Sequence, residues 1–433
     1  MKKQLLTLSM LLAAIPAAAS LTYSPSSYST TLLTNKVAHN TNTKLWIPEY
    51  EAPSALYNLN TAANRIEFAN ASTLGSLLTK WRANQNETPI VIAHFGDSHV
   101  QPGWQVAPIR KALQTARGNG GRGMIFPYTI AKRTYSQEDY TITSTGSWRT
   151  ANSIQQPPKI GVGVTGFVAV TSDSFVKVNF KFKQSADTLG NINAALNFRA
   201  MNGRYEVTAS NGVASQTKVI DANIDNQIQS VNFELPDTDK EFSFTISRLS
   251  GGPNAEFEFH GVNLDNANIN GGVTYHNLGV GGANFKAIEQ QKHFEQFASL
   301  NADLVILDWG TNDILYTNSI PNYLERTIRN TIQKVRAINP NAAILLSSVQ
   351  ETRYKGQRTT AAAQYSELLR RIAIEENVMF YDWYQVSGGP GSMRIFQDTG
   401  YANPKDSIHL NGKGYRVKGE LFAQALVDAL NNN

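Results

Sequence analysis

Two segments that lie far apart in the chain contain residue types that together can activate a hydroxyl group. Ser98 follows a short apolar run and lies in the sequence Gly-Asp-Ser-His. Asp406 and His409 lie three positions apart near the other end of the chain. A serine, an imidazole that takes its proton and a carboxylate that orients the imidazole are the three parts of an activated serine nucleophile. The sequence therefore contains the residues for acyl-transfer chemistry.

The elements expected around these residues follow an alternating α/β pattern. Apolar runs without polar alternation predict buried strands at residues 89–93, 303–307, 343–347 and 378–381. Amphipathic stretches predict helices at residues 72–83, 323–337, 361–375 and 414–430. Such strands, separated by helices, indicate a parallel sheet covered on both faces. Sites in such sheets form at the carboxyl ends of the strands, where Ser98 and the turn after residue 307 are expected.

The middle of the chain has a different character. From about residue 143 to residue 268, apolar and polar residues alternate with period two, as in Val176, Val178, Phe180 and Phe182. This pattern, with turn signals between the runs, predicts an antiparallel β-sandwich. We therefore expect an α/β domain over residues 71–142 and 269–433, interrupted by an inserted β domain over residues 143–268. Residues 20–70 have little periodicity and are expected to form an irregular N-terminal extension.

The N-terminus predicts export. Lys2 and Lys3 precede an apolar run over residues 5–15, and three alanines at 17–19 form a small-residue cleavage site. This is the pattern of a secretory signal peptide over residues 1–19. No later run is long and apolar enough for a membrane helix, and the chain has no cysteine for a lipid anchor, a disulfide or a thiolate metal site. We expect a soluble exported protein without a membrane anchor.

Length and charge narrow the classes of function. A chain of 433 residues with 41% hydrophobic residues is long enough for two globular domains. Its 39 basic and 34 acidic residues give a net charge of +5, or +3 (37 minus 34) without the two lysines of the signal peptide. This mild excess is spread along the chain, so it suits an ordinary surface or contact with an anionic glycan and does not predict binding to nucleic acid.

Four segments resemble, in order, the blocks of the SGNH (GDSL-type) hydrolases. They are Gly-Asp-Ser at 96–98, the glycine-rich run Asn-Leu-Gly-Val-Gly-Gly-Ala-Asn at 277–284, Gly-Thr-Asn-Asp at 310–313 and Asp-x-x-His at 406–409. The Gly-Asp-Ser tripeptide alone is a weak signal, but four blocks in order are specific. The resemblance covers roughly residues 75–142 and 270–431, and it implies a flavodoxin-like α/β fold.

The resemblance also implies the role of each residue. Ser98 would be the nucleophile, His409 the general base and Asp406 the residue that orients the imidazole. The backbone N–H groups of Ser98 and Gly282 and the side-chain amide of Asn312 would hold the oxyanion. Gly281 competes with Gly282 for this role, and Asn312 has the alternative of bracing its loop through its own amide. Neither a cofactor nor a metal is expected.

Three histidines and one aspartate near the blocks are candidate metal ligands by residue type. His94, His99, His276 and Asp97 lack the spacing of a zinc motif, and Asp97 is expected to fix the turn around Ser98. The aromatic residues of the insert are expected in its core. Tyr205 and Trp148 are the candidates for exposed rings that could stack on a sugar.

The position of the insert refines the resemblance. Ser98 and Gly282 lie 184 positions apart, far more than is usual in the family, and the inserted domain accounts for the excess. This architecture, the Gly-Asp-Ser-His sequence and a Gly-Gly-Arg-Gly segment at 120–123 resemble peptidoglycan O-acetylesterases of Gram-negative cell envelopes, in which the insert is similar to a carbohydrate-binding module. One departure is Leu410, where the family commonly has proline after the histidine.

The resemblance implies a periplasmic serine esterase that removes O-acetyl groups from a glycan, with peptidoglycan as the first choice. Acetylated xylan or capsule is the alternative substrate. Acetyl transfer to a sugar is an alternative reaction, and a non-catalytic glycan-binding protein is the least favoured class. The oligomeric state and the acyl chain length are open from the sequence.

Overall fold

The protein is described by a computed structural model over residues 50–131, 134–155, 160–222, 227–289, 292–315, 317–354 and 357–433. The predicted signal peptide and the predicted extension up to residue 49 lie outside these ranges. All the described residues belong to one compact unit. Within them, no helix combines the length and the apolar character that a membrane crossing needs.

A parallel sheet forms the centre of the α/β part. Its strands are β2 (Pro89–Gly96), β3 (Asn119–Ile125), β12 (Gly272–Gly279), β13 (Leu304–Asp308), β14 (Ala343–Ser347) and β17 (Met379–Tyr381). They lie in the order β3-β12-β2-β13-β14-β17, and each neighbouring pair is parallel. Without β3, this is the order 2-1-3-4-5 of the flavodoxin-like fold. The predicted fold class is therefore confirmed.

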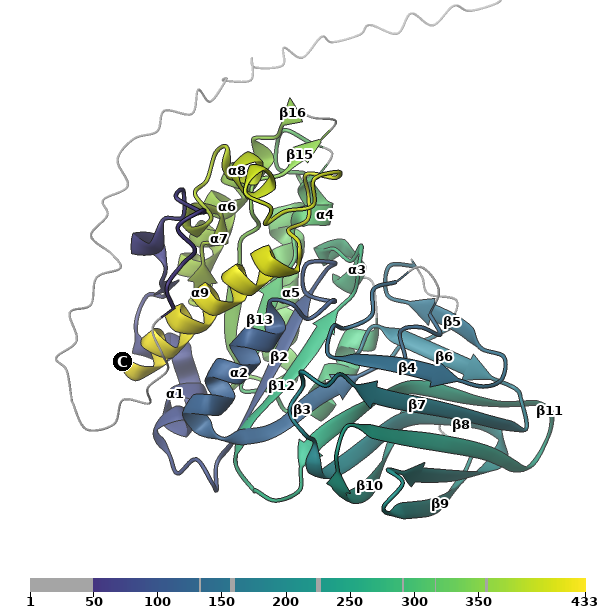
Figure 1. The fold of residues 1–433 in the computed structure, drawn as a ribbon. Coiled ribbons are helices and arrows are strands. Elements are labelled where there is room, and N and C mark those ends of the chain that lie inside the picture. The colour runs from purple at the N-terminus through teal and green to yellow at the C-terminus, as the bar shows by residue number, and fades with distance from the viewer. Residues whose placement is uncertain are drawn as a thin grey trace, which may run out of the picture. The chain divides into compact units, whose positions relative to one another are not determined.

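Helices cover both faces of this sheet. Successive residues of a strand point to opposite faces, so an apolar strand has side chains to bury on each face. Leu304 and Ile306 pack in a core with α1 (Gly75–Arg82), α2 (Val106–Arg117) and α9 (Gly412–Asn431). Val305 and Leu307 pack in a second core with α3 (Phe285–Glu289), α5 (Leu324–Ile338) and α6 (Ala361–Glu375). Figure 1 shows α9 running beside α2, with which it makes close contact. The helices keep water from both faces of the sheet, so the ends of the strands are its accessible part.

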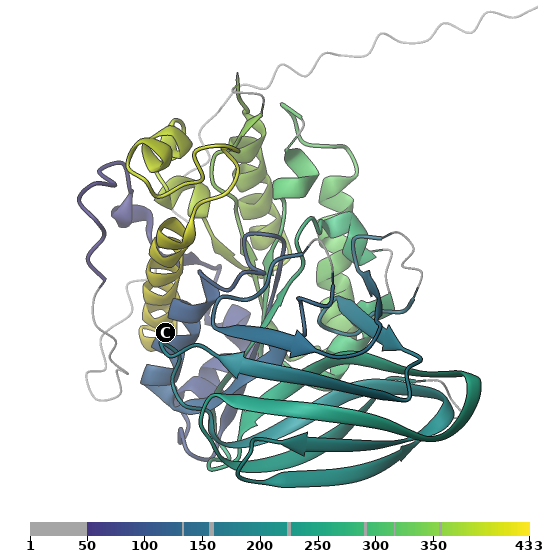
Figure 2. The ribbon, with the colours of Figure 1, turned by 45° about the vertical axis from the view of Figure 1, so that its right-hand side comes forward.

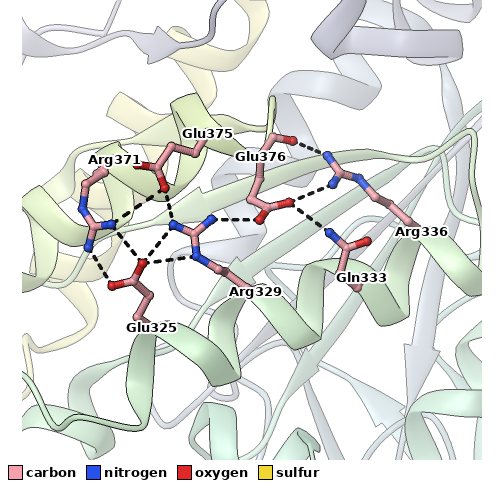
Figure 3. Close-up of polar contacts among 7 residues, drawn as sticks. All are labelled: Glu325, Arg329, Gln333, Arg336, Arg371, Glu375 and Glu376. Atoms are coloured by element: carbon pink, nitrogen blue, oxygen red, sulfur yellow. Dashed lines mark hydrogen bonds and ion pairs between the residues drawn. The ribbon is translucent and has the colours of Figure 1, made fainter.

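A network of ion pairs joins α5 to α6 (Figure 3). Arg329 contacts the carboxylates of Glu325, Glu375 and Glu376, with N–O distances of 2.9 Å to Glu325 and 2.8 Å to Glu376. Arg371 adds a second contact to Glu325 at 2.7 Å. The guanidinium of Arg329 thus connects both helices at one point.

The insert consists of antiparallel strands that continue the same sheet beyond β3. Its strands are β4 (Tyr140–Ser144), β5 (Arg149–Asn152), β6 (Phe167–Thr171), β7 (Phe175–Phe182), β8 (Gly190–Ser210), β9 (Ser215–Asp221), β10 (Gln229–Thr238) and β11 (Glu241–Asn266). The C-terminal part of β11 pairs with β3, and this pairing joins the insert to the parallel sheet. The predicted β region is present, and its first strand begins at Tyr140.

Two long strands, β8 and β11, pair with each other along most of their length and contribute to both layers of the insert (Figure 2). The first part of β11 pairs with β7, and the part after a register shift pairs with β6. Phenylalanines fill the space between the layers, as in the contact between Phe244 and Phe259, whose ring centroids are 6.2 Å apart. This core is continuous with the core on the α5 and α6 face of the parallel sheet.

Some elements differ from the expectation. The glycine-rich run predicted as a loop at 277–284 begins inside β12, because Asn277, Leu278 and Gly279 pair with β2. Part of the predicted N-terminal extension packs on the α/β domain: β1 (Ile66–Glu67) pairs with β17, and Leu56 is buried. The remaining short elements are η2 (Thr61–Ala63), η3 (Ala71–Leu74), η4 (Lys292–Leu300), α4 (Thr311–Ile314), α7 (Trp383–Val386), α8 (Ser392–Asp398), β15 (Arg353–Tyr354) and β16 (Gln357–Arg358).

Candidate active site

Ser98 lies in a tight turn directly after β2. The strand ends at Gly96, where a side chain has no room because a Cβ would lie 2.2 Å from Val100 Cγ2. The Asp97 carboxylate accepts a hydrogen bond from the backbone N–H of His99 at 2.9 Å, and its carbonyl accepts from Val100 and Gln101. These bonds hold the turn around Ser98, in agreement with the structural role expected for Asp97.

The serine, the histidine and the carboxylate come together in one chain of hydrogen bonds. Ser98 Oγ lies 2.8 Å from His409 Nε2, and His409 Nδ1 lies 2.9 Å from Asp406 Oδ2. With Nδ1–H donated to the carboxylate, Nε2 is free to accept the serine proton. The Ser98 side chain is largely buried and His409 is one-quarter exposed, so the site opens to solvent on the histidine side.

The turn that carries Asp406 and His409 is held by the carboxylate itself. Asp406 Oδ1 accepts the backbone N–H groups of Ile408 and His409 at 2.9 and 3.0 Å, and Oδ2 accepts from the Asn403 side chain at 2.9 Å. Burial raises the pKa of Asp406, but the hydrogen bonds from His409 and from the backbone outweigh it and lower the pKa to about 2. Asp406 is therefore ionised near neutral pH.

Leu410, the departure from the family pattern, is anchored by burial instead of by a proline ring. Its side chain packs in the α9 core, and its backbone forms a bridge with Ala402. The following residue, Asn411, caps α9 by accepting the N–H groups of Lys413 and Gly414. The histidine is thus held between an ordered turn and a capped helix.

The geometry distinguishes Gly282 from Gly281 as an oxyanion donor. Gly281 donates its N–H to the side chain of Gln101 at 2.5 Å. The N–H groups of Ser98 and Gly282 donate to no acceptor in the described part of the chain. Gly282 also has a φ of 84°, a conformation that favours glycine. The resemblance implies these two N–H groups as oxyanion donors, and the bond from Gly281 to Gln101 favours Gly282 over Gly281.

Asn312 joins the two loops of the site. It lies in α4, after β13, and its Nδ2 donates to the carbonyl of Ala283 at 2.9 Å and to Asp97 Oδ2 at 3.3 Å. The first bond braces the loop that carries Gly282, as the alternative reading expected. The second bond is long and weak, so this hydrogen is available to a stronger acceptor such as an oxyanion. Both expected roles are therefore compatible with its position.

Two buried carboxyl groups lie beside the oxyanion residues. Burial raises the pKa of Asp97 and of Asp313 to about 7 in each case. Asp313 Oδ2 accepts the backbone N–H of Phe285 at 3.3 Å, which ties the start of α3 to α4. Neither carboxyl group is fully ionised at neutral pH, which limits the negative charge near the place where an oxyanion forms.

His99 has a role that sequence reasoning missed. Its ring stacks on the His409 ring with the centroids 4.9 Å apart, and its Nδ1 lies within 3.0 Å of Gln350 Nε2 and 2.7 Å of the Tyr415 hydroxyl. Burial, followed by the proximity of His409, lowers the pKa of His99 well below its ordinary value. His99 therefore stays uncharged beneath His409. Its signals in the sequence were its position next to Ser98 and its place in the Gly-Asp-Ser-His segment.

The other two candidate histidines for a metal site contact different partners. His94 contacts the Tyr275 hydroxyl, and His276 accepts the backbone N–H of Met124. Within the described ranges, no three His, Asp or Glu side chains converge as metal ligands would.

The aromatic residues of the insert divide in a way that the sequence did not settle. Tyr205, expected as an exposed ring, is only 2% exposed, because its ring packs on Phe257 in the core. Trp148 is half-buried, and it donates its indole N–H to the Thr145 carbonyl. Phe175, expected in the core, is exposed at the start of β7. Tyr205 is therefore not available for stacking on a sugar.

Part of the chain matches a known protein family. Residues 248–417 match the GDSL-like lipase/acylhydrolase family. This segment contains Gly282, Asn312, Asp406 and His409, whereas Ser98 lies before the insert and outside the match. No curated protein matches the sequence.

A solved structure of a peptidoglycan O-acetylesterase has the same fold. It is 22% identical, covers 87% of this chain and 99% of its own, and has a TM-score of 0.69. A family two carbohydrate esterase from Cellvibrio japonicus is 12% identical, covers 67% of this chain and 99% of its own, and has a TM-score of 0.26. A GDSL-like lipase from Bacteroides thetaiotaomicron is 23% identical, covers 36% of this chain and 76% of its own, and has a TM-score of 0.28. Both structures are too distant in shape to support an argument. Residues 248–417 thus match the GDSL-like lipase/acylhydrolase family, and the fold of the chain resembles that of a peptidoglycan O-acetylesterase.

Proposed function

We propose that this protein is a serine esterase that removes O-acetyl groups from a glycan, with peptidoglycan as its substrate. The observation that carries the proposal is the chain of hydrogen bonds from Ser98 Oγ through His409 to Asp406, next to two N–H groups with no acceptor in the described structure. The family match and the likeness of fold to a peptidoglycan O-acetylesterase support the class of reaction.

In the first half of the reaction, Ser98 Oγ attacks the acetyl carbonyl carbon while His409 Nε2 takes the serine proton. The oxyanion of the tetrahedral intermediate accepts the N–H groups of Ser98 and Gly282 and the amide of Asn312. When the intermediate collapses, the bond between the carbonyl carbon and the sugar oxygen breaks. His409 gives the proton to that oxygen, which leaves as a free hydroxyl group.

In the second half, water attacks the acetyl group on Ser98. His409 takes a proton from the water and returns it to Ser98 Oγ, so that acetate and the free enzyme result. The exposure of His409 supports hydrolysis because it leaves a route for water to the acyl-enzyme. No metal or cofactor is required by this sequence of steps.

The choice of glycan and of compartment rests on the sequence. The predicted signal peptide at residues 1–19 supports export to the periplasm, where peptidoglycan lies. Fractionation of the producing cells would test the location, and recovery of the protein in the cytoplasm at its full length would contradict it.

The activity is tested by the release of acetate from O-acetylated peptidoglycan and from acetylated xylan, with Ser98→Ala as the control. We expect release from peptidoglycan to be faster, and the variant to lose at least about 10³-fold in kcat because the nucleophile is gone. Unchanged activity in Ser98→Ala would refute the mechanism. Faster release from xylan would move the substrate to another polysaccharide, and acetylated sugar in place of free acetate would indicate transfer.

A further inference from the structure

Two exposed apolar side chains lie at the oxyanion loop. Among the described residues, eight large hydrophobic side chains are exposed, and they are Tyr57, Tyr135, Ile154, Phe175, Val213, Val219, Leu249 and Ile374. Two of these lie against the glycines of the site. A Cβ built on Gly281 would lie 3.1 Å from Tyr135 Cδ2 and Cε2, and one built on Gly282 would lie 3.7 Å from Ile154 Cδ1 and Cγ2. An exposed apolar surface at a reaction centre is typical of a ligand-binding site.

The backbone that carries Tyr135 is tied to the oxyanion loop by one buried side chain. Gln101, three residues after Ser98, has no solvent exposure. Its Nε2 donates to Thr134 Oγ1 at 2.6 Å and to the Tyr135 carbonyl at 2.5 Å, while its Oε1 accepts the N–H of Gly281 at 2.5 Å. A single amide thus fixes the nucleophile turn, the glycine loop and the Tyr135 backbone relative to one another.

The residues after Tyr135 are also anchored to the α/β domain. The N–H of Glu138 donates to the Pro102 carbonyl at 2.8 Å. Asp139 pairs with Arg122 at 2.6 Å and with Arg110 at 3.2 Å. The attraction of these two guanidinium groups outweighs the effect of burial and lowers the pKa of Asp139 to about 2. The segment that carries Tyr135 is therefore held at both ends, and its aromatic ring is presented on a fixed backbone.

We infer that Tyr135, with Ile154 beside it, forms the platform on which the sugar ring bearing the scissile acetyl ester packs. The inference rests on the proposed function, because the sugar is the leaving group of that reaction. When the acetyl carbonyl carbon lies at Ser98 and its oxygen at the Gly282 N–H, the sugar oxygen on the same carbon lies toward His409, and the attached sugar ring can reach the apolar side chains at the glycine loop. Tyr135 offers there an apolar ring, half exposed, that the C–H face of a pyranose can cover.

The inference assigns the insert a task at the reaction centre. Tyr135 lies in the connection from β3 to β4, where the chain enters the insert, and Ile154 lies in the connection from β5 to β6 within the insert. These two residues, and not the buried Tyr205, would select a sugar ester over a small ester. Selectivity for the polymer then depends on the entry to the insert and on its β5–β6 connection.

The test compares a glycan substrate with a small ester that has no sugar. Acetate release from O-acetylated peptidoglycan and hydrolysis of p-nitrophenyl acetate are measured for the wild type, Tyr135→Ala and Tyr135→Phe. We expect Tyr135→Ala to lose about tenfold in kcat/KM on the glycan, mainly through KM, because the sugar loses the apolar ring on which it packs. The loss on the small ester should be at least fivefold smaller, and Tyr135→Phe should restore the glycan activity.

A matched control and a second variant sharpen the result. Tyr57→Ala removes a tyrosine that is 78% exposed and outside the site, and it should change neither activity. Gly281→Ala, at a residue without a positive φ, adds a Cβ 3.1 Å from the Tyr135 ring and 3.1 Å from Gln101 Oε1. The ring must therefore shift by a few tenths of an ångström, and the glycan activity should fall by more than the small-ester activity.

Two results would overturn the platform. Equal losses on both substrates in Tyr135→Ala would show a structural role, and equal activity of Tyr135→Ala and the wild type on the glycan would show no role. In both cases the wild type still releases acetate from the glycan, so the proposed function stands. If the wild type releases acetate from no glycan, the proposed function fails and the platform fails with it.

Discussion

Replacement of Asn312 by alanine separates stabilisation of an oxyanion from bracing of a loop. The Asn312 amide donates one hydrogen to the Ala283 carbonyl at 2.9 Å and makes a long contact of 3.3 Å with Asp97. The variant loses the first bond in the resting enzyme, and it loses the second hydrogen as a donor to the oxyanion. The two losses affect different quantities, because the first changes the free energy of unfolding and the second changes kcat.

The magnitudes follow from these contacts. Loss of one neutral hydrogen bond costs about 1 kcal/mol of folding stability. Loss of one oxyanion donor costs about 3 kcal/mol of transition-state stabilisation, which is about 10²-fold in kcat. Asn312→Asp should lower kcat at least as much, because it keeps the shape of the side chain but replaces the donor by an acceptor that faces the developing negative charge.

Asn284→Ala provides the matched control in the same loop. The Asn284 side chain accepts the N–H of Ala287 at 2.8 Å, so this variant also loses one bond that orders the loop, at a cost of about 1 kcal/mol, but removes no donor from the site. The assay is kcat on p-nitrophenyl acetate, with urea unfolding for stability. We expect a loss of about 10²-fold for Asn312→Ala and less than about fivefold for Asn284→Ala. Equal losses in the two variants would refute the oxyanion role and leave only bracing.

Two further predictions concern stability. Burial raises the pKa of Asp313 to about 7 from 3.8, so the folded state binds a proton that the unfolded state releases, and stability falls as the pH rises from about 4 to about 7. Each pKa unit corresponds to about 1.4 kcal/mol, so Asp313→Asn should raise the free energy of unfolding by up to about 4 kcal/mol over the wild type at pH 8 and by little at pH 4. Urea unfolding at both pH values measures this difference, and a gain that does not depend on pH would contradict the prediction. Arg329→Met should cost about 1 kcal/mol in low salt and less in 1 M NaCl, because it removes the centre of the network in Figure 3. Arg394→Met, which breaks one exposed pair with Asp398, should change stability by less than about 0.5 kcal/mol, and an equal cost for both variants would show that the network adds nothing.

Much of the α/β domain could be predicted from local pattern. Apolar runs identified β2, β13, β14 and β17, and amphipathic stretches identified α5, α6 and α9, because burial on one or both faces leaves a periodic trace in the sequence. β12 was missed because its residues 272–279 include two glycines, a histidine and an asparagine, which read as a loop. Its burial between β2 and β3 comes from pairing with strands far away in the sequence, which no local pattern records.

The residues that carry the proposed chemistry were recognisable by type and order, but their partners were not. Ser98 and His409 are 311 positions apart in the sequence but hydrogen-bonded in the structure. They meet because the turn after β2 lies beside the turn that precedes α9. The choice of Gly282 over Gly281 depends on Gln101, whose side-chain oxygen already accepts a hydrogen bond from the Gly281 N–H. Likewise, nothing local shows that Tyr205 is buried and Tyr135 exposed.

By itself, the sequence determined the class of fold, the order of the four blocks and the residue types that can transfer an acyl group. Only the tertiary structure decided which N–H groups are free, which histidine stacks on His409 and which aromatic ring lies beside the reaction centre. The physical reason is that type and periodicity are local properties of the chain. A hydrogen bond or a ring contact depends instead on the register of strands and on the packing of segments that are hundreds of residues apart.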